Sequence, residues 1–253
     1  MQRTVFDCVV EGDLGGVRRL LEIDRKGVLT ARLCSFTPLL AASQKGQTDI
    51  VRELLQQGGS VNDRSAEGAT ALLHAAGYGH SEVCRLLLSY GSNVKDRTNE
   101  GGTPLLGAAQ MGHTAICRLL LSYGSSLNEQ HPATAFTSLH MAVQQGHFST
   151  VEELLKCGAS VKDRTADGST PLIIATRHGL NAICNLLLAH GSNVGEQLPN
   201  GNTPLLMAVN RGNLVLVKEL LELGASVKDR NIDEGFTPLI RAAHCYQCLH
   251  CPA

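Results

Sequence analysis

The sequence predicts an all-α solenoid, built from one short helix–turn–helix repeat that recurs along the chain. A Thr followed two residues later by Leu returns every 33 or 34 residues, at Thr37, Thr70, Thr103, Thr137, Thr170, Thr203 and Thr237. Two glycine series keep this interval, the first at Gly46, Gly79, Gly112, Gly146, Gly179 and Gly212 and the second at Gly58, Gly91, Gly124, Gly158, Gly191 and Gly224. Aromatic residues are scarce, with no Trp, 4 Tyr and 5 Phe, so the core must consist of many thin aliphatic layers.

The first helix of each repeat is predicted to begin at the Thr. The Thr hydroxyl can cap a helix, and the Pro that usually follows sits where its missing N–H costs nothing. The helix is about two turns long and ends at a Gly of the first series, which can adopt the left-handed conformation. The second helix carries paired leucines such as Leu54 and Leu55, and it ends at the second Gly. Turn-forming residues such as 64–68 then predict a hairpin-like finger.

We expect a single domain of seven repeats and a truncated eighth. The boundaries fall at about 2–34, 35–67, 68–100, 101–134, 135–167, 168–200, 201–234 and 235–253. The first repeat is a more polar variant, as expected of an N-terminal cap. In the eighth, Tyr246 stands where the first Gly belongs, and no second helix is predicted.

These signals resemble the ankyrin-repeat family over nearly the whole chain. The resemblance is carried by Thr103-Pro104-Leu105, Ala108-Ala109, Gly112-His113, Leu119-Leu120 and Gly158-Ala159. It implies a module that binds another protein in the groove between its fingers and inner helices, without naming the partner. It also implies a structural role in the turn for the histidines that follow the first Gly, at His80, His113 and His147.

The main departure from the family pattern lies after the Thr-Pro-Leu signal, where the family has His. This chain keeps it only as His140 and elsewhere has Leu40, Leu73, Leu106, Ile173 and Leu206. Each replacement is expected to exchange a hydrogen bond for apolar contact.

The family's geometry places the groove floor at the two residues before each first-series Gly. The candidate partner-binding residues are Lys45, Tyr78, Gln110, Met111, Gln144, Gln145, Arg177, His178, Asn210 and Arg211. Tyr78 and Met111 are suited to apolar contact, while Arg177 and Arg211 are basic and are expected to have few acidic neighbours. Such a surface is suited to an aromatic or acidic segment of a partner. Solvated variation explains any single one of these residues equally well.

Four fingers carry an Asp-Arg dipeptide, ending at Arg64, Arg97, Arg164 and Arg230. Because each Arg follows an acid, we expect the pairs to bridge adjacent fingers rather than to bind a ligand. An exposed pair of this kind contributes under about 1 kcal/mol.

Composition excludes several classes of function. With 22 Lys+Arg against 23 Asp+Glu the net charge is -1, and no basic run appears, so a nucleic-acid partner is not expected. No segment approaches the roughly 18 apolar residues that would cross a membrane. No catalytic or phosphate-binding motif is found, so we expect neither enzymatic activity nor a cofactor. An odd number of scattered cysteines indicates a reducing compartment, which is the cytoplasm or alternatively the nucleus. Separately, we expect the protein to be a monomer.

The tail His244-Cys245-Tyr246-Gln247-Cys248-Leu249-His250-Cys251 resembles a metal site in composition. Structural zinc sites usually combine two ligand pairs separated by a dozen or more residues, whereas this run is compact. We therefore favour an aborted repeat over a zinc site and assign no metal.

Taken together, these features predict a non-enzymatic protein-binding scaffold or adaptor. One alternative is the substrate-recognition subunit of a ubiquitin ligase, although no ligase-recruiting box is visible. The other is the repeat portion of a larger enzyme or channel.

Overall fold

The structure is a computed structural model of the 253-residue chain, and it describes residues 3–232 and 235–243. In those ranges the regular structure is helical, apart from an isolated antiparallel bridge between Leu33 and Phe36. The chain separates into two compact units, Met1–Pro132 and Ala133–Ala253. Each unit is built from repeats of one inner helix and one outer helix, as the sequence predicts.

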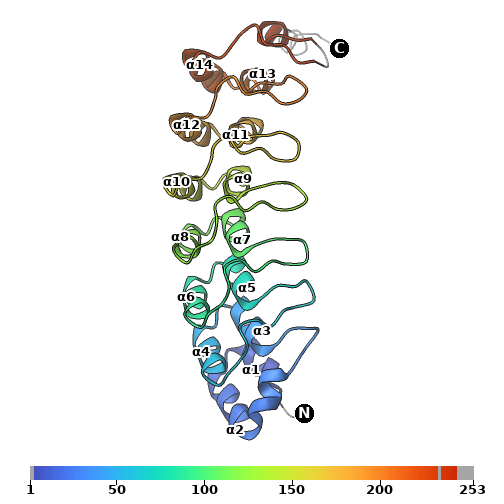
Figure 1. Cartoon of the computed structure of the whole chain (residues 1–253), viewed down its shortest axis with the longest axis vertical. Helices are drawn as coiled ribbons and strands as arrows, with labels where there is room; N and C mark the ends of the chain where they lie inside the picture. Colours follow the sequence, from blue (N-terminus) through green and yellow to red (C-terminus); the bar gives the residue numbers. More distant parts are fainter. Residues whose placement is uncertain (1–2, 233–234, 244–253) are drawn as a thin grey trace. The chain divides into compact units, whose positions relative to one another are not determined.

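The first unit contains four helix pairs. Its inner helices are α1 (Val5–Glu11), α3 (Pro38–Gln44), α5 (Ala71–Tyr78) and α7 (Pro104–Gln110), and its outer helices are α2 (Leu14–Thr30), α4 (Thr48–Gln56), α6 (Ser81–Ser89) and α8 (Thr114–Ser122). Within this unit the inner helices from α3 to α7 lie between the outer helices and the projecting fingers (Figure 1).

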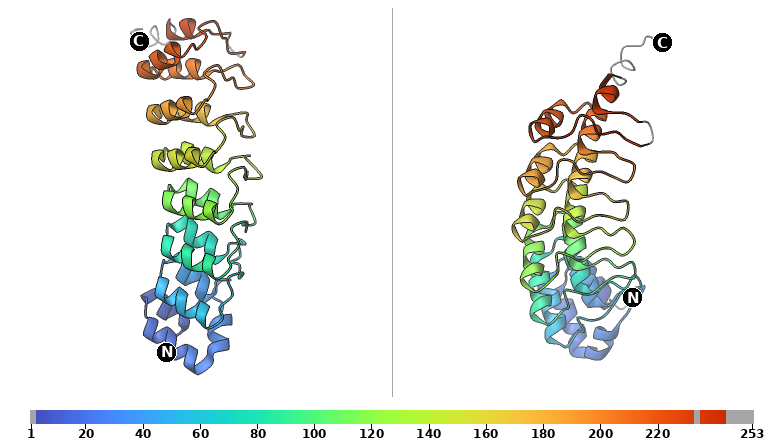
Figure 2. Two further views of the ribbon diagram at one scale, coloured as in Figure 1. Left: turned by 60° about the vertical axis from the view of Figure 1, so that its left-hand side comes forward. Right: turned by 45° about the horizontal axis from the view of Figure 1, so that its top comes forward.

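The second unit repeats the arrangement. Its inner helices are α9 (Ser138–Gln144), α11 (Pro171–His178) and α13 (Pro204–Asn210), and its outer helices are α10 (Phe148–Lys156), α12 (Asn181–Ala189) and α14 (Leu214–Glu222). Residues 238–243 are helical at the start of the eighth repeat. In both views of Figure 2 the fingers of this unit project away from its outer helices.

The predicted Thr caps are confirmed at the inner helices. The hydroxyl of Thr103 accepts a hydrogen bond from the backbone N–H of Leu106 at 3.3 Å, and Pro104 occupies the first helical turn. The same cap begins the helices after Thr37, Thr137, Thr170 and Thr203. Thr70 is the exception, because its buried hydroxyl has no partner among the described residues.

The turn between inner and outer helix depends on contact between neighbouring repeats. Gly79 has φ +85°, and a β-carbon there would stand 2.6 Å from the His113 ring of the next repeat. The Nε2 of His113 donates to the carbonyl of Gly77 at 3.2 Å, and the Nε2 of His80 donates to the carbonyl of Gln44 at 2.9 Å. The structural role predicted for His80 and His113 is confirmed, because each ring satisfies a carbonyl at the end of the preceding inner helix.

The core is a series of aliphatic layers. One leucine of each outer-helix pair is fully buried, as at Leu54, Leu87, Leu120, Leu154, Leu187 and Leu220. Small residues on the inner helices let neighbouring repeats approach closely, since a β-carbon on Gly107 would lie only 4.0 Å from the Cα of Gly77. Cys84, Cys117 and Cys184 are buried within these layers, as predicted. Burial raises the pKa of Cys84 to about 12 and that of Cys184 to about 11, so both thiols stay protonated.

His140 is a buried polar group with its hydrogen bonds satisfied. Its Nδ1 accepts from the backbone N–H of Thr137 at 3.2 Å, and its Nε2 donates to the carbonyl of Asp163 at 3.1 Å. At the same place in other repeats Leu40, Leu106, Ile173 and Leu206 are buried. The predicted exchange of a hydrogen bond for apolar contact is confirmed at these four positions, whereas Leu73 is only half-buried.

The fingers are tied to one another by arginines. The Arg64 guanidinium donates to the Gly68 carbonyl of its own finger at 2.7 Å and to the Arg97 carbonyl of the next finger at 2.8 Å. It also lies 2.7 Å from the carboxylate of Asp96, which confirms the predicted pairing of Asp and Arg across adjacent fingers. Arg164 repeats the pattern with the carbonyls of Gly168 and Gln197.

The cysteine- and histidine-rich tail and Tyr246 lie outside the described residues. The proposed aborted repeat and the alternative zinc site at Cys245, Cys248 and Cys251 therefore both stay predictions.

Replacing Leu120 in α8 with Ala should lower the free energy of unfolding by about 2–5 kcal/mol, because its side chain is fully buried between repeats. Denaturant unfolding followed by circular dichroism would measure the change. Leu214, which is 78% exposed on α14, is the control, and its change to Ala should cost under about 0.5 kcal/mol. Equal losses from the two variants would contradict the layered core.

His140→Leu should make stability less dependent on pH. Burial lowers the pKa of His140. Below about pH 6.5 the unfolded chain therefore takes up a proton that the folded chain does not, and the free energy of unfolding decreases as the pH is lowered. Leu removes this contribution, while His74, whose pKa is also lowered by burial, retains its own. Urea unfolding at pH 7, 6 and 5 would compare the two proteins, and parallel losses of stability would contradict a buried neutral imidazole.

Candidate functional site

The candidate site consists of exposed residues at the C-terminal ends of the inner helices. All ten predicted residues are exposed there: Lys45, Tyr78, Gln110 and Met111 in the first unit, and Gln144, Gln145, Arg177, His178, Asn210 and Arg211 in the second. They lie one or two residues before the glycine that ends each inner helix. The preceding residues of these helices are largely buried, so each helix exposes mainly its C-terminal end to solvent.

In the first unit this surface has an aromatic and aliphatic character. Tyr78 and Met111 hold equivalent places in neighbouring repeats and are 58% and 56% exposed. The Tyr78 hydroxyl accepts a hydrogen bond from the Gln44 side chain at 3.0 Å, and its ring stacks with His80 at a centroid distance of 6.5 Å. These two contacts hold the Tyr78 ring in one orientation, which would lower the entropy cost of any contact made with it.

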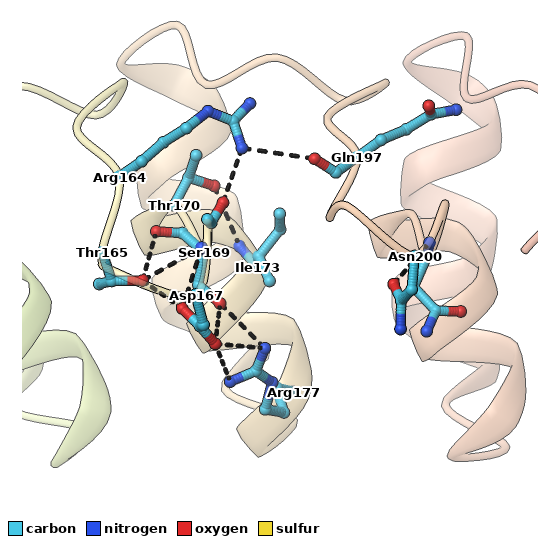
Figure 3. Close-up of polar contacts among 11 residues, drawn as sticks. Arg164, Thr165, Asp167, Ser169, Thr170, Ile173, Arg177, Gln197 and Asn200 are labelled. Atoms are coloured by element: carbon cyan, nitrogen blue, oxygen red, sulfur yellow. Dashed lines mark hydrogen bonds and ion pairs between the residues drawn. The ribbon is translucent and has the colours of Figure 1, made fainter. Parts of the chain in front are cut away.

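In the second unit the Arg177 side chain turns toward the finger of its own repeat. Its guanidinium lies 3.4 Å from the Asp167 carboxylate and donates to the Ser169 hydroxyl at 2.9 Å (Figure 3). The expectation that Arg177 has few acidic neighbours is wrong. The sequence hides this contact because Asp167 precedes Arg177 by ten residues, and only the return of the chain from finger to helix end brings the two together.

Asp167 is the centre of a hydrogen-bond network in this finger. Burial acts to raise the pKa of its carboxyl group, but the Thr165 hydroxyl, the backbone and side chain of Ser169 and the Arg177 charge lower it to about 2. The backbone N–H of Ser169 donates to Asp167 Oδ1 at 3.1 Å, and the Ser169 hydroxyl donates to Oδ2 at 2.9 Å. Asp167 is therefore ionised at neutral pH and holds Arg177 in place.

Arg211 differs from Arg177 in its surroundings. Its Nη1 lies 3.7 Å from the place of a β-carbon on Gly179, so its side chain reaches the end of α11, next to His178. Within residues 3–232 and 235–243 no carboxylate lies within ion-pair distance of Arg211. The basic character of this surface therefore rests on Arg211, with His178 beside it.

Asn210 borders a hollow that the sequence does not predict. The hollow has a volume of about 240 Å³ and is lined by Asn202, Leu206, Met207, Asn210, Asn231, Phe236 and Arg241. Arg241 donates to the Asn210 side chain at 2.9 Å and lies 5.5 Å from the centre of the Phe236 ring. One feature of the sequence points to the aromatic residue of this hollow: Phe236, like Phe36 and Phe136, stands directly before the Thr that caps an inner helix.

The described ranges contain no group of three or more His, Cys, Asp or Glu side chains arranged to hold a metal ion. None of the helices within them combines the length and hydrophobicity needed to span a bilayer. The exposed inner-helix ends offer amides, two arginines, a lysine, an imidazole and apolar groups. This mixture of groups suits contact with the surface of another protein.

Comparison with known proteins agrees with this architecture. The family model described as ankyrin repeats (3 copies) matches residues 5–98, 39–131, 93–165, 127–197 and 172–251. The crystal structure of the human ASB11 ankyrin repeat domain is similar, with a TM-score of 0.75, 26% sequence identity, and coverage of 86% of this chain and 100% of that chain. No curated protein sequence matches. The repeats, their caps and the matches along the chain together show that it belongs to the ankyrin-repeat family.

Proposed function

We propose that this chain is a non-enzymatic, monomeric scaffold or adaptor that binds a protein partner through the exposed ends of its inner helices. Ankyrin repeats generally mediate protein–protein interaction. The observation that carries the proposal is the contrast within each inner helix, where a largely buried body ends in one or two exposed residues that differ from repeat to repeat. A cytoplasmic or nuclear location is part of the proposal, and the six described cysteines, which are all free, support it.

In the second unit we propose an acidic segment as the ligand. Arg211 and His178 lie at the ends of neighbouring inner helices, and the guanidinium of Arg211 has no described acidic partner to neutralise it. Arg177 serves mainly to brace the finger through Asp167 and contributes less charge to the surface. An acidic segment would therefore gain most from Arg211.

In the first unit we propose apolar contact as the main contribution. Tyr78 offers an oriented ring and Met111 an adaptable side chain, and both are more than half exposed. Aromatic side chains and Met are enriched at the cores of protein interfaces. Lys45, in the repeat before Tyr78, lies at the edge of the same surface.

Affinity capture followed by mass spectrometry would identify the partner. Recovery of one acidic protein, lost when Arg211 is reversed, would support a scaffold that reads an acidic segment. Stable recovery of ubiquitin-ligase subunits would favour the substrate-recognition alternative.

Arg211→Glu should slow association with the captured partner and reduce its dependence on salt, because electrostatic attraction mainly sets the association rate. Arg177→Glu should have the smaller direct effect, since that charge is already paired with Asp167. Surface plasmon resonance at 50 and 300 mM salt would measure both variants.

The control for this experiment is the double reversal Arg52→Glu and Arg85→Glu on the outer helices α4 and α6. It replaces two positive charges with two negative charges on a surface that the proposal leaves unoccupied. Loss of binding in this control, with normal binding by Arg211→Glu, would move the binding surface to the outer helices.

A further inference from the structure

The outer helices of the second unit carry a groove that is separate from the inner-helix ends. A groove of about 360 Å³ runs between α12 and α14 and is lined by Asn185, Leu188, Ala189, Glu219, Glu222 and Leu223. Its apolar floor comes from the last turn of α12 and the end of α14. Its polar groups are an amide and two carboxylates.

One oxygen of this groove lacks a hydrogen bond. Glu219 Oε1 accepts from the side-chain amide of Asn185 at 3.1 Å. Glu219 Oε2 is buried and accepts no hydrogen bond from any residue in the described ranges. A buried carboxylate oxygen without a donor is unfavourable, so this atom favours a ligand that can donate to it.

The first unit shows which donor satisfies the equivalent carboxylate. Glu53, the sixth residue of α4, accepts from Arg18 Nε at 2.8 Å and from the Gln57 side chain at 3.2 Å. Arg18 is the fifth residue of the preceding outer helix, α2. An arginine beside an outer-helix glutamate is therefore an arrangement that this chain already uses.

In the second unit both of those donors have been replaced. Asn185 holds the place of Arg18, as the fifth residue of α12, and Glu219 holds the place of Glu53. Leu223 stands where the first unit has Gln57. The substitutions remove a positive charge, leave one carboxylate oxygen without a donor, and shorten the side chain that would otherwise fill the groove.

The helix ends add to the preference for a cation. Leu188 and Ala189 end α12, and Glu222 ends α14, so the groove lies at the negative ends of two helix dipoles. Neither helix carries a basic residue in its last turn. Lys218 pairs with Glu222, with its Nζ 3.9 Å from the carboxylate and its side chain 80% exposed.

We propose that this groove binds an arginine side chain of a partner protein. The aliphatic stem packs on Leu188, Ala189 and Leu223, while the guanidinium donates to Glu219 Oε2 and approaches Glu222. Arginine fits better than lysine because its planar fork can serve two acceptors at once and it is less strongly hydrated. The site is separate from the inner-helix ends, so its failure would leave the proposed scaffold function untouched.

The test uses the full 253-residue chain and the peptide acetyl-Ala-Arg-Ala-amide as the probe. Methyl NMR should show the signals of Leu188, Ala189 and Leu223 moving on titration. The matched peptide with citrulline in place of arginine keeps the shape but loses the charge, and it should move them far less. Absent shifts, or equal shifts with both peptides, would overturn the proposal.

Two variants locate the contact. Glu219→Gln should weaken probe binding about tenfold, because it removes the charged acceptor. Glu152→Gln on α10 is the control: this outer-helix glutamate is paired with Lys156 at 3.0 Å and does not line the groove, so the change should leave probe binding unaltered. Asn185→Arg should reproduce the Arg18–Glu53 pair, occupy the groove from within, raise the thermal midpoint and abolish probe binding. Unaltered binding by Glu219→Gln or by Asn185→Arg would refute a guanidinium site at Glu219.

Discussion

The structure depends on one constraint: no repeat has enough apolar surface of its own to form a closed core, so every layer must be covered by its neighbour. The end of the second unit illustrates this. Leu205 in α13 is 1% exposed, whereas Leu239, at the same place in the helical stretch 238–243, is 77% exposed. No further outer helix covers Leu239 within the described residues. The regular recurrence of Thr, Gly and Leu follows from this constraint, because a nearly constant repeat length keeps each layer in contact with the next.

The same constraint explains what could be predicted from the sequence. Helix starts were readable because Thr and Pro act on their own local backbone, as at Thr103 and Pro104. The places of the exposed residues followed from the family resemblance, whose geometry puts them directly before the glycine at the end of each inner helix. The structural role of the turn histidines also followed from the family resemblance, and His80 and His113 have that role.

The contacts that sequence reasoning missed are those made by long polar side chains. Nothing in the spacing shows that the Arg177 side chain turns toward its own finger, since its guanidinium could equally have extended over the exposed ends of the inner helices. The missing donor at Glu219 could be predicted in part from the sequence, because alignment of the outer helices places Asn185 at the position of Arg18. The consequence for Glu219 depends on the burial and hydrogen bonding of its carboxylate, which the sequence does not give.

The arginine links between fingers have a consequence for mutational mapping. Arg64 belongs to one finger but holds the backbone carbonyl of Arg97 in the next. Removing it would loosen a loop that belongs to the following repeat, as removing Arg164 would loosen the loop at Gln197. In a scan of finger residues, the segment that loses its shape would thus be displaced by one repeat toward the C-terminus from the residue that was changed.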